Sequence, residues 1–234
     1  MERKYFDSTF GKISYLTRDG EYPVYFLHGF GSTGNVWLKT DEYINKKIMP
    51  FYIDLLGHGH SDKPDIQYTV KNMADAIIEF INSQKYDKFS IVGHSYGGWI
   101  ALKIAILKNP ENLILIDSAG ISPTLSEEYP DTYKDIIKNI VRTHNYKNEN
   151  ALINIMEINK NSTEKLTDND LMEINCNTVI IWGSEDKTLD IKYGKMMNER
   201  IKNSKLYIID GAGHTPQYIR PDKIAEIINN TLKF

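Results

Sequence analysis

Short apolar runs alternate along the chain with longer segments in which apolar residues recur every three to four positions. A continuous apolar run is typical of a strand covered on both faces, and the longer period is typical of an amphipathic helix. The alternation predicts an α/β protein with a mostly parallel sheet and helices on both faces. The runs lie at residues 23–27, 51–54, 89–92, 113–117, 178–182 and 205–209; helices are expected at 35–43, 69–84, 96–109, from 191 onward, and at 221–232.

The first twenty residues differ from this rhythm because they contain two alternating segments and no helical pattern. Tyr5-Phe6 and Ile13-Ser14-Tyr15-Leu16 are separated by Gly11, and Asp19-Gly20 marks a turn after the second segment. This arrangement predicts an opening β-hairpin.

The alternation is interrupted between about residues 120 and 175, where helical patterns follow one another without a strand. They are expected from Tyr129 to Ile140, from Ala151 to Ile158, and from Thr167, which forms a capping-box-like start with Asp170. Long insertions at the carboxyl edge of a sheet tend to be functional. We therefore expect residues 1–120 and 176–234 to form a core and residues 121–175 a small helical cap over a pocket. The alternative is that these helices only shield the sheet edge.

Composition limits the class of protein further. The 234 residues include 41% hydrophobic residues and carry a net charge of −3 without a basic block, so nucleic acid and anionic membranes are not expected partners. A single cysteine, Cys176, excludes an internal disulfide and suits a reducing compartment. The charged start and the lack of a long apolar run predict a soluble, cytoplasmic protein without membrane insertion.

The run at 89–92 leads into the segment that carries the strongest chemical signal. Gly93-His94-Ser95-Tyr96-Gly97 fits the G-x-S-x-G pattern, and it lies between an expected strand and an expected helix. A sharp turn there would expose the Ser95 hydroxyl at a helix N-terminus, where backbone N–H groups favour negative charge. The glycines would be needed because a Cβ would collide with the neighbouring chain. Ser95 is the candidate nucleophile, although a tight structural turn would have the same pattern.

A serine nucleophile needs a base, and the base needs an anion that fixes its tautomer. Asp186 follows the strand expected at 178–182, and His214 lies in a glycine-rich loop after the next strand. The order Ser, Asp, His, each at the carboxyl end of a strand, is the order found in α/β-hydrolases. Asp117, which ends the preceding strand, is the alternative acid. Asp186 could instead fill a turn, although Asp190 is better placed to cap the next helix.

Five other histidines compete with His214 for the role of base. They are His28, His58, His60, His94 and His144. His94 adjoins the nucleophile, but in a tight turn its side chain would point away. For an oxyanion hole, two backbone N–H donors are needed. The residue after the nucleophile, Tyr96, supplies one, and we assign the other to Phe30 in the first glycine-rich loop.

Five segments together resemble the α/β-hydrolase superfamily. They are His28-Gly29-Phe30-Gly31; Asp54 with Gly57-His58-Gly59-His60-Ser61; Gly93-His94-Ser95-Tyr96-Gly97-Gly98; Gly183-Ser184-Glu185-Asp186; and Gly213-His214. The resemblance covers nearly the whole chain. It implies an eight-stranded, mostly parallel sheet with a cap between strands six and seven, and the catalytic residues Ser95, Asp186 and His214. It also implies that no metal and no cofactor takes part.

Two departures from the superfamily narrow the expected reaction. Ser95 stands where haloalkane dehalogenases and epoxide hydrolases carry aspartate, and the short cap suits a small substrate. The leading hypothesis is a serine carboxylesterase that hydrolyses small acyl esters or thioesters. A C–C bond hydrolase or a pyruvate-eliminating synthase of menaquinone biosynthesis is the alternative; its carboxylated substrates would need cationic anchors such as Lys134, Lys138, Arg142 or Lys147. A ligand-binding receptor, like some plant hormone receptors, is a third hypothesis.

Overall fold

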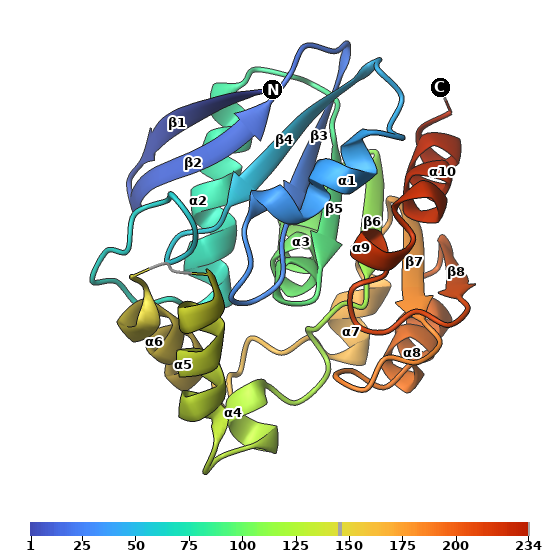
Figure 1. Cartoon of the computed structure of the whole chain (residues 1–234). Coiled ribbons are helices and arrows are strands. Elements are labelled where there is room, and N and C mark those ends of the chain that lie inside the picture. The colour runs from blue at the N-terminus through green and yellow to red at the C-terminus, as the bar shows by residue number, and fades with distance from the viewer. Residues whose placement is uncertain (145–146, 234) are drawn as a thin grey trace.

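One mixed sheet forms the centre of the computed structural model, which describes residues 1–144 and 147–233. Within these residues the sheet has eight strands in the order β1-β2-β4-β3-β5-β6-β7-β8 (Figure 1). Strands β1 and β2 pair antiparallel, β2 also pairs antiparallel with β4, and all other neighbours are parallel. The strands are β1 (Glu2–Ser8), β2 (Gly11–Thr17), β3 (Tyr22–Leu27), β4 (Ile48–Asp54), β5 (Ser90–His94), β6 (Asn112–Ile116), β7 (Asn177–Gly183) and β8 (Ser204–Ile209). The predicted opening hairpin and the mostly parallel α/β sheet are confirmed.

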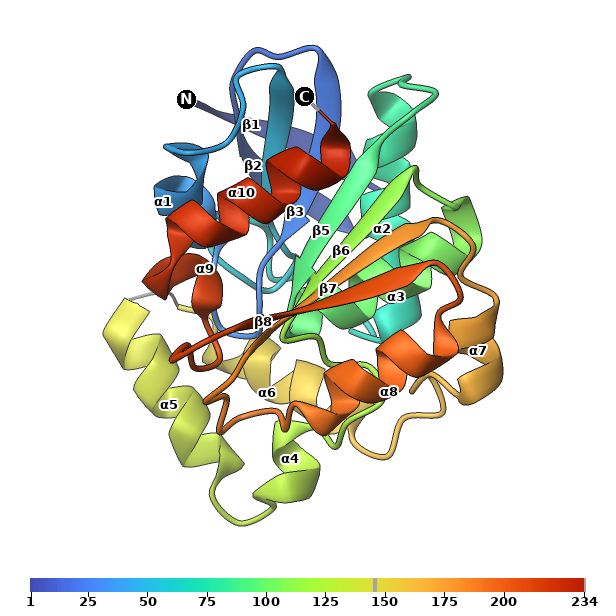
Figure 2. The ribbon, with the colours of Figure 1, turned by 90° about the vertical axis from the view of Figure 1, so that its right-hand side faces the viewer.

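Helices cover both faces of this sheet (Figure 2). The helices are η1 (Gly34–Trp37, a 3₁₀ turn), α1 (Leu38–Asp41), α2 (Val70–Ser83), α3 (Tyr96–Lys108), α4 (Leu125–Glu128), α5 (Tyr133–His144), α6 (Glu149–Asn159), α7 (Asp168–Met172), α8 (Lys192–Arg200), α9 (Pro216–Ile219) and α10 (Pro221–Leu232). Helices α2 and α3 lie on one side, whereas α1, α9 and α10 lie on the other.

The central strands are apolar on both faces, and their residues alternate between two cores. In β3, Tyr25 and Leu27 pack with α2 and α3, whereas Val24 and Phe26 pack with Trp37 of η1 and with α10. Such alternation follows from the two-residue period of a strand. It explains why these strands appear in the sequence as continuous apolar runs.

The insertion between β6 and β7 contains α4 to α7, and α4, α5 and α6 gather at one end of the sheet (Figures 1 and 2). The helix expected from Tyr129 to Ile140 is present as α5, but it begins at Tyr133 rather than at Tyr129. Pro130 disfavours helical geometry at the preceding residue, and Tyr129 has φ −126° and ψ 61°. The start expected at Thr167 is confirmed, since Thr167 and Asp170 form a capping box at α7. In the described residues, no helix has the length and apolarity needed to cross a bilayer.

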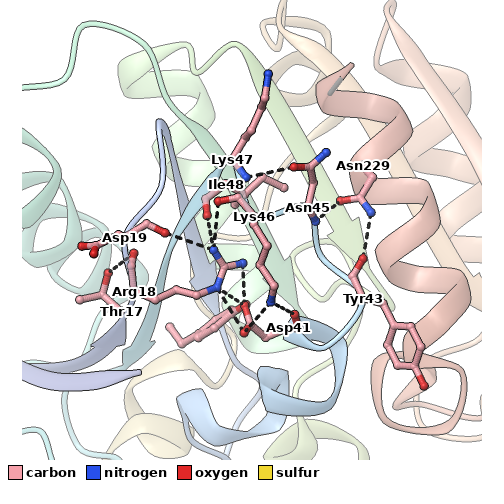
Figure 3. A network of polar contacts seen from close by, with 11 residues as sticks. Thr17, Arg18, Asp19, Asp41, Tyr43, Asn45, Lys46, Lys47, Ile48 and Asn229 are labelled. Carbon is pink, nitrogen blue, oxygen red and sulfur yellow. Dashed lines mark hydrogen bonds and ion pairs between the residues drawn. The ribbon is translucent and has the colours of Figure 1, made fainter.

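A polar network far from these helices ties β2 to α1 and β4 (Figure 3). The guanidinium of Arg18 donates to the Ile48 carbonyl at 2.7 Å and pairs with the Asp41 carboxylate at 2.9 Å. Tyr52 donates its hydroxyl to the same carboxylate at 2.8 Å. Asp41 and Arg18 are both mostly buried, so each depends on the other to compensate for lost hydration.

Replacing Arg18 by methionine should therefore lower the free energy of unfolding by about 2–3 kcal/mol, because Asp41 keeps its charge but loses its main partner. Urea unfolding followed by far-UV circular dichroism measures this. The matched control is Lys46→Met, because the exposed Lys46 reaches the Asp41 carboxylate only at 4.0 Å and otherwise donates weakly to the Asp41 carbonyl at 3.4 Å. The effect of this variant should stay below about 0.5 kcal/mol. Equal effects of the two variants would contradict the role given to Arg18.

Candidate active site

The turn between β5 and α3 places Ser95 in a strained conformation. Its φ is +51° and its ψ is −117°, a region that side-chain-bearing residues rarely adopt. A Cβ on Gly97 would lie 2.5 Å from the His28 carbonyl oxygen, and one on Gly93 would lie 2.5 Å from the Gly97 carbonyl oxygen. The expectation that glycine is required on both sides is confirmed. Ser95 itself is partly exposed, at the N-terminus of α3.

Three side chains that lie far apart in the sequence are linked here by hydrogen bonds. His214 Nδ1 lies 2.7 Å from Asp186 Oδ2, and His214 Nε2 lies 2.9 Å from Ser95 Oγ. Because an ionised carboxylate can only accept, Nδ1 carries the proton, and Nε2 is left to accept the proton of the Ser95 hydroxyl. The structure thus brings Ser95, His214 and Asp186 together in the order that general-base activation of a serine requires.

Asp186 is held by the loop that follows β7 as well as by His214. Its Oδ1 accepts hydrogen bonds from the backbone N–H groups of Thr188 at 2.7 Å and Leu189 at 3.0 Å. Burial acts to raise the pKa of Asp186, but the hydrogen bonds from His214 and from this backbone outweigh burial, so its pKa is lowered. Asp186 is therefore ionised and can stabilise a protonated His214. In the described part of the chain, Asp190 forms no hydrogen bond with His214. Its carboxylate instead accepts from Lys192 N–H at the start of α8.

The alternative acid, Asp117, lies in the same region but takes a different position. Its Oδ1 accepts a hydrogen bond from Gly183 N–H at 2.8 Å, and no hydrogen bond joins it to His214 among the described residues. Burial and the neighbouring Asp186 charge raise the pKa of Asp117, although the Gly183 bond opposes this. The carboxyl of Asp117 is thus favoured in its neutral form.

The other histidines have partners that keep them from acting as the base. Burial lowers the pKa of His28 to about 4 and that of His58 and His94 to about 3, so all three are neutral at neutral pH. His94 Nε2 donates to the His214 carbonyl at 2.7 Å, and His58 Nδ1 donates to the Leu56 carbonyl at 3.1 Å. His60 is exposed on its loop. The side chain of His144 lies outside the part of the chain that the structure describes.

The first glycine-rich loop is fixed by its own histidine. His28 Nδ1 donates to the Gly29 carbonyl at 2.8 Å, while its Nε2 accepts from Leu55 N–H at 3.0 Å. The Ser32 N–H also donates to the Gly29 carbonyl, at 3.1 Å. Because the peptide is planar and trans, holding that carbonyl directs the Phe30 N–H the opposite way. The Phe30 and Tyr96 rings meet edge to face at 6.4 Å, which places these two residues side by side.

A cavity of about 820 Å³ opens over Ser95 and His214. This volume is within the range of small-molecule sites. Its walls come from the loops after β3, β5, β6, β7 and β8 and from the insertion between β6 and β7. Residues that sequence reasoning did not assign to substrate complete the wall: Trp99, Leu125, Tyr129, Ile136, Ile140, Met156, Asn159, Leu189 and Tyr218. All of them except Asn159 have large apolar or aromatic side chains, which was visible in the sequence, but nothing there indicated which of them face a cavity.

Cationic side chains of the insertion point away from this cavity. Lys134 pairs with Glu157 at 3.0 Å, Lys138 pairs with Asp135 at 3.1 Å, and all four side chains are at least half exposed. Arg142 and Lys147 are also exposed. Among the described residues that line the cavity, none is a lysine or an arginine.

Metal-ligating side chains approach one another at a single place in the described residues. Ligand atoms of His94, Asp117 and His214 lie within 4.8 Å of one another. Both ring nitrogens of His214 are already hydrogen-bonded, to Ser95 and Asp186. His94 Nε2 is also occupied, by the His214 carbonyl. This arrangement suits proton transfer rather than coordination of an ion.

Known proteins resemble the chain along nearly its whole length. It is 26% identical to 2-hydroxy-6-oxo-6-(2'-aminophenyl)hexa-2,4-dienoic acid hydrolase of Metapseudomonas resinovorans over 253 residues, 94% of this chain and 86% of that protein. It is 23% identical to monoacylglycerol lipase ABHD6 of Mus musculus over 261 residues, 92% of this chain and 77% of that protein. A crystal structure of a membrane phospholipase A, a bacterial virulence factor, matches with a TM-score of 0.87 at 22% identity, covering 99% of this chain and 86% of that one.

A family profile, described as the alpha/beta hydrolase fold, matches residues 22–141. This match includes the first glycine-rich loop, Ser95 and strands β3 to β6. The remaining strands complete the eight-stranded sheet, and the two relatives described above are a hydrolase and a lipase. The chain is a member of the α/β-hydrolase family and a hydrolase.

Proposed function

We propose that the protein is a serine hydrolase that cleaves small, uncharged carboxylic esters or thioesters through an acyl-enzyme on Ser95. The hydrogen-bonded series from Asp186 through His214 to Ser95, opening into an apolar cavity, supports this proposal. The proposal needs no metal and no cofactor.

In the first half of the reaction, the Ser95 hydroxyl attacks the substrate carbonyl while His214 Nε2 takes its proton. Asp186 stabilises the imidazolium that forms, since it accepts from His214 Nδ1 at 2.7 Å. We assign the oxyanion hole to the N–H groups of Phe30 and Tyr96, each of which would supply about 3–4 kcal/mol of transition-state stabilisation. His214 then gives its proton to the leaving alcohol or thiol.

In the second half, water enters and His214 acts as the base again. It removes a proton from water, which attacks the acyl carbonyl, and it returns that proton to Ser95 as the acid leaves. The insertion would act as the proposed cap, residues 121–175, and limit the entry of water and substrate. Ile140 of α5 lies against the first glycine-rich loop, where a Cβ added to Gly31 would lie 2.6 Å from it.

The lack of lysine and arginine among the described residues that line the cavity favours an ester over the carboxylated C–C bond substrate of the alternative hypothesis. The relative from Metapseudomonas resinovorans is named for a carboxylic acid substrate, which makes C–C hydrolysis the second candidate. A carboxylate buried in an apolar cavity needs a cationic or hydrogen-bonding partner. The outward direction of Lys134, Lys138 and Arg142 counts against such an anchor.

A substrate panel would separate these reactions. The purified protein should hydrolyse p-nitrophenyl acetate or butyrate and the matching thioesters with kcat/KM at least about 100-fold above that for a carboxylated vinylogous diketone of similar size, because burying the unpaired carboxylate costs several kcal/mol. Preferential turnover of the diketone would instead favour the C–C hydrolase. Tight binding of ligands without any turnover would favour a receptor.

We further propose a cytoplasmic location, supported by the lone buried Cys176.

A further inference from the structure

Asp117, which no step of the proposed reaction uses, has a left-handed backbone conformation next to the proposed catalytic residues. Its side chain is fully buried at the carboxyl end of β6, and its backbone φ is +41°. Aspartate tolerates this left-handed conformation better than most residues, but at some cost. The backbone is fixed there, because the Asp117 N–H donates to the Ile181 carbonyl at 2.9 Å. This fixed backbone conformation therefore holds the Asp117 carboxyl group in one position.

In that position the Asp117 carboxyl group lies next to the side chains of Asp186 and His214. An Asp117 carboxyl oxygen lies within 4.8 Å of a His214 ring nitrogen. Its Oδ1 accepts from Gly183 N–H, whereas Oδ2 is buried and has no partner among the hydrogen bonds of the described residues. Strands β6 and β7 are parallel neighbours, so Asp117 directly after β6 and Asp186 in the loop after β7 lie at the same edge of the sheet, where the Asp186 carboxylate acts directly on Asp117. Two buried carboxyls so close together hold one proton more readily than two negative charges.

We propose that Asp117 is a positioning residue that donates a carboxyl hydrogen bond to Asp186 and becomes the anionic partner of His214 when the Asp186 carboxylate is missing. This inference rests on the proposed serine hydrolase function and deepens it. In the wild type, the proton stays on Asp117, and its O–H keeps Asp186 turned toward His214 Nδ1. If Asp186 is removed, burial still raises the pKa of Asp117, but the neighbouring negative charge that raises it further is gone, and the Nδ1–H of His214 is left without its acceptor, which Asp117 can replace. Asp117 then releases the proton to solvent and accepts the Nδ1–H after a side-chain rotation.

The test compares Asp186→Ala with the double variant Asp186→Ala/Asp117→Asn. Asparagine is chosen because it tolerates a positive φ and keeps an acceptor for Gly183 N–H. A triad without its acid loses about 10⁴-fold in kcat. We expect Asp186→Ala to lose only about 10²-fold, because Asp117 replaces the acid, and the double variant to lose about 10⁴-fold. Asp117→Asn alone should lose about ten-fold or less, the effect of one hydrogen bond.

Two further measurements distinguish a positioning role of Asp117 from a merely structural one. The proton on His214 Nδ1 should give a low-field NMR signal in the wild type and in Asp186→Ala, and no such signal in the double variant. Asp190→Asn in the Asp186→Ala background is the matched control, because Asp190 lies in the same loop as Asp186, and in the described part of the chain its carboxylate accepts only from Lys192 N–H. This change should alter neither kcat nor the signal. Thermal unfolding verifies that each variant is folded.

The outcomes separate this inference from the function on which it rests. A wild type without esterase or thioesterase activity and without Ser95 labelling by a fluorophosphonate would overturn both. An active wild type in which Asp186→Ala is as slow as the double variant, and lacks the low-field signal, would overturn the role of Asp117 alone. A further loss of kcat in the double variant, with the control unchanged, would support it.

Discussion

Replacing Ser95 by alanine should lower kcat for p-nitrophenyl acetate by about 10⁵–10⁶-fold, the loss known for a serine nucleophile of this kind. The reason is that alanine removes the only atom that can form the acyl bond, whereas the cavity and the backbone N–H groups remain. Alanine also fits the space of the serine, so the fold and the binding of substrate should persist. Initial rates, combined with binding of a non-hydrolysable ester analogue, measure both properties.

Ser184→Ala is the matched control for this experiment. Ser184 also follows the carboxyl end of a strand, but it is exposed and its hydroxyl accepts from Gly211 N–H at 2.9 Å. The control should keep kcat within about two-fold, as expected of a surface substitution. Full activity in Ser95→Ala, with the fold intact, would end the acyl-enzyme proposal.

Replacing His214 by glutamine should lower kcat by a similar factor, about 10⁵–10⁶-fold, because Ser95 then has no base. The effects of His214→Gln and Ser95→Ala should not add. When two residues act as one unit, removing either one abolishes nearly all of the rate enhancement that the unit provides. The double variant should therefore be about as slow as each single variant. Steady-state rates of the three variants test this directly.

His60→Gln is the control, since His60 is exposed on the loop after β4 and lies outside the lining of the cavity. An additive loss in the Ser95→Ala/His214→Gln variant would show that the two residues act independently. Such a result would contradict the hydrogen-bonded unit, even if each single variant were inactive.

The mostly parallel sheet and the placement of Ser95, Asp186 and His214 at the carboxyl ends of strands could be predicted, because both leave local patterns in the sequence. Buried parallel strands appear as apolar runs, and the conformation around Ser95 leaves a glycine pattern that a Cβ would disrupt. The carboxyl ends of parallel strands meet at one edge, so residues at those ends approach one another whatever their distance in the sequence.

Other features could not be predicted from the apolar pattern. Strand β4 begins at Ile48 rather than at residue 51, because Pro50 pairs with Val24 of β3 despite having no N–H group. The break at Tyr129 was signalled by Pro130, and the capping box of Thr124 and Glu127 marks the start of α4. Periodicity alone did not show either feature.

The histidines illustrate the limit of sequence reasoning most clearly. His28, His94 and His214 all lie at or just beyond the carboxyl ends of strands, and their roles differ through their partners. Asp117 and Asp186 both follow the carboxyl ends of neighbouring strands, β6 and β7. Side-chain directions decide which carboxylate forms a hydrogen bond with the His214 imidazole, and the pattern of apolar residues in the sequence does not determine these directions.

Reaction with a fluorophosphonate, followed by mass mapping of the peptides, tests the central claim most directly. We expect one stable adduct, on Ser95, with a loss of ester hydrolysis in proportion to labelling and no adduct in His214→Gln. Protection of Ser95 by a competing ester should slow the labelling. An enzyme that keeps its full esterase activity while Ser95 is completely labelled, or that is labelled only at another residue, would contradict the account.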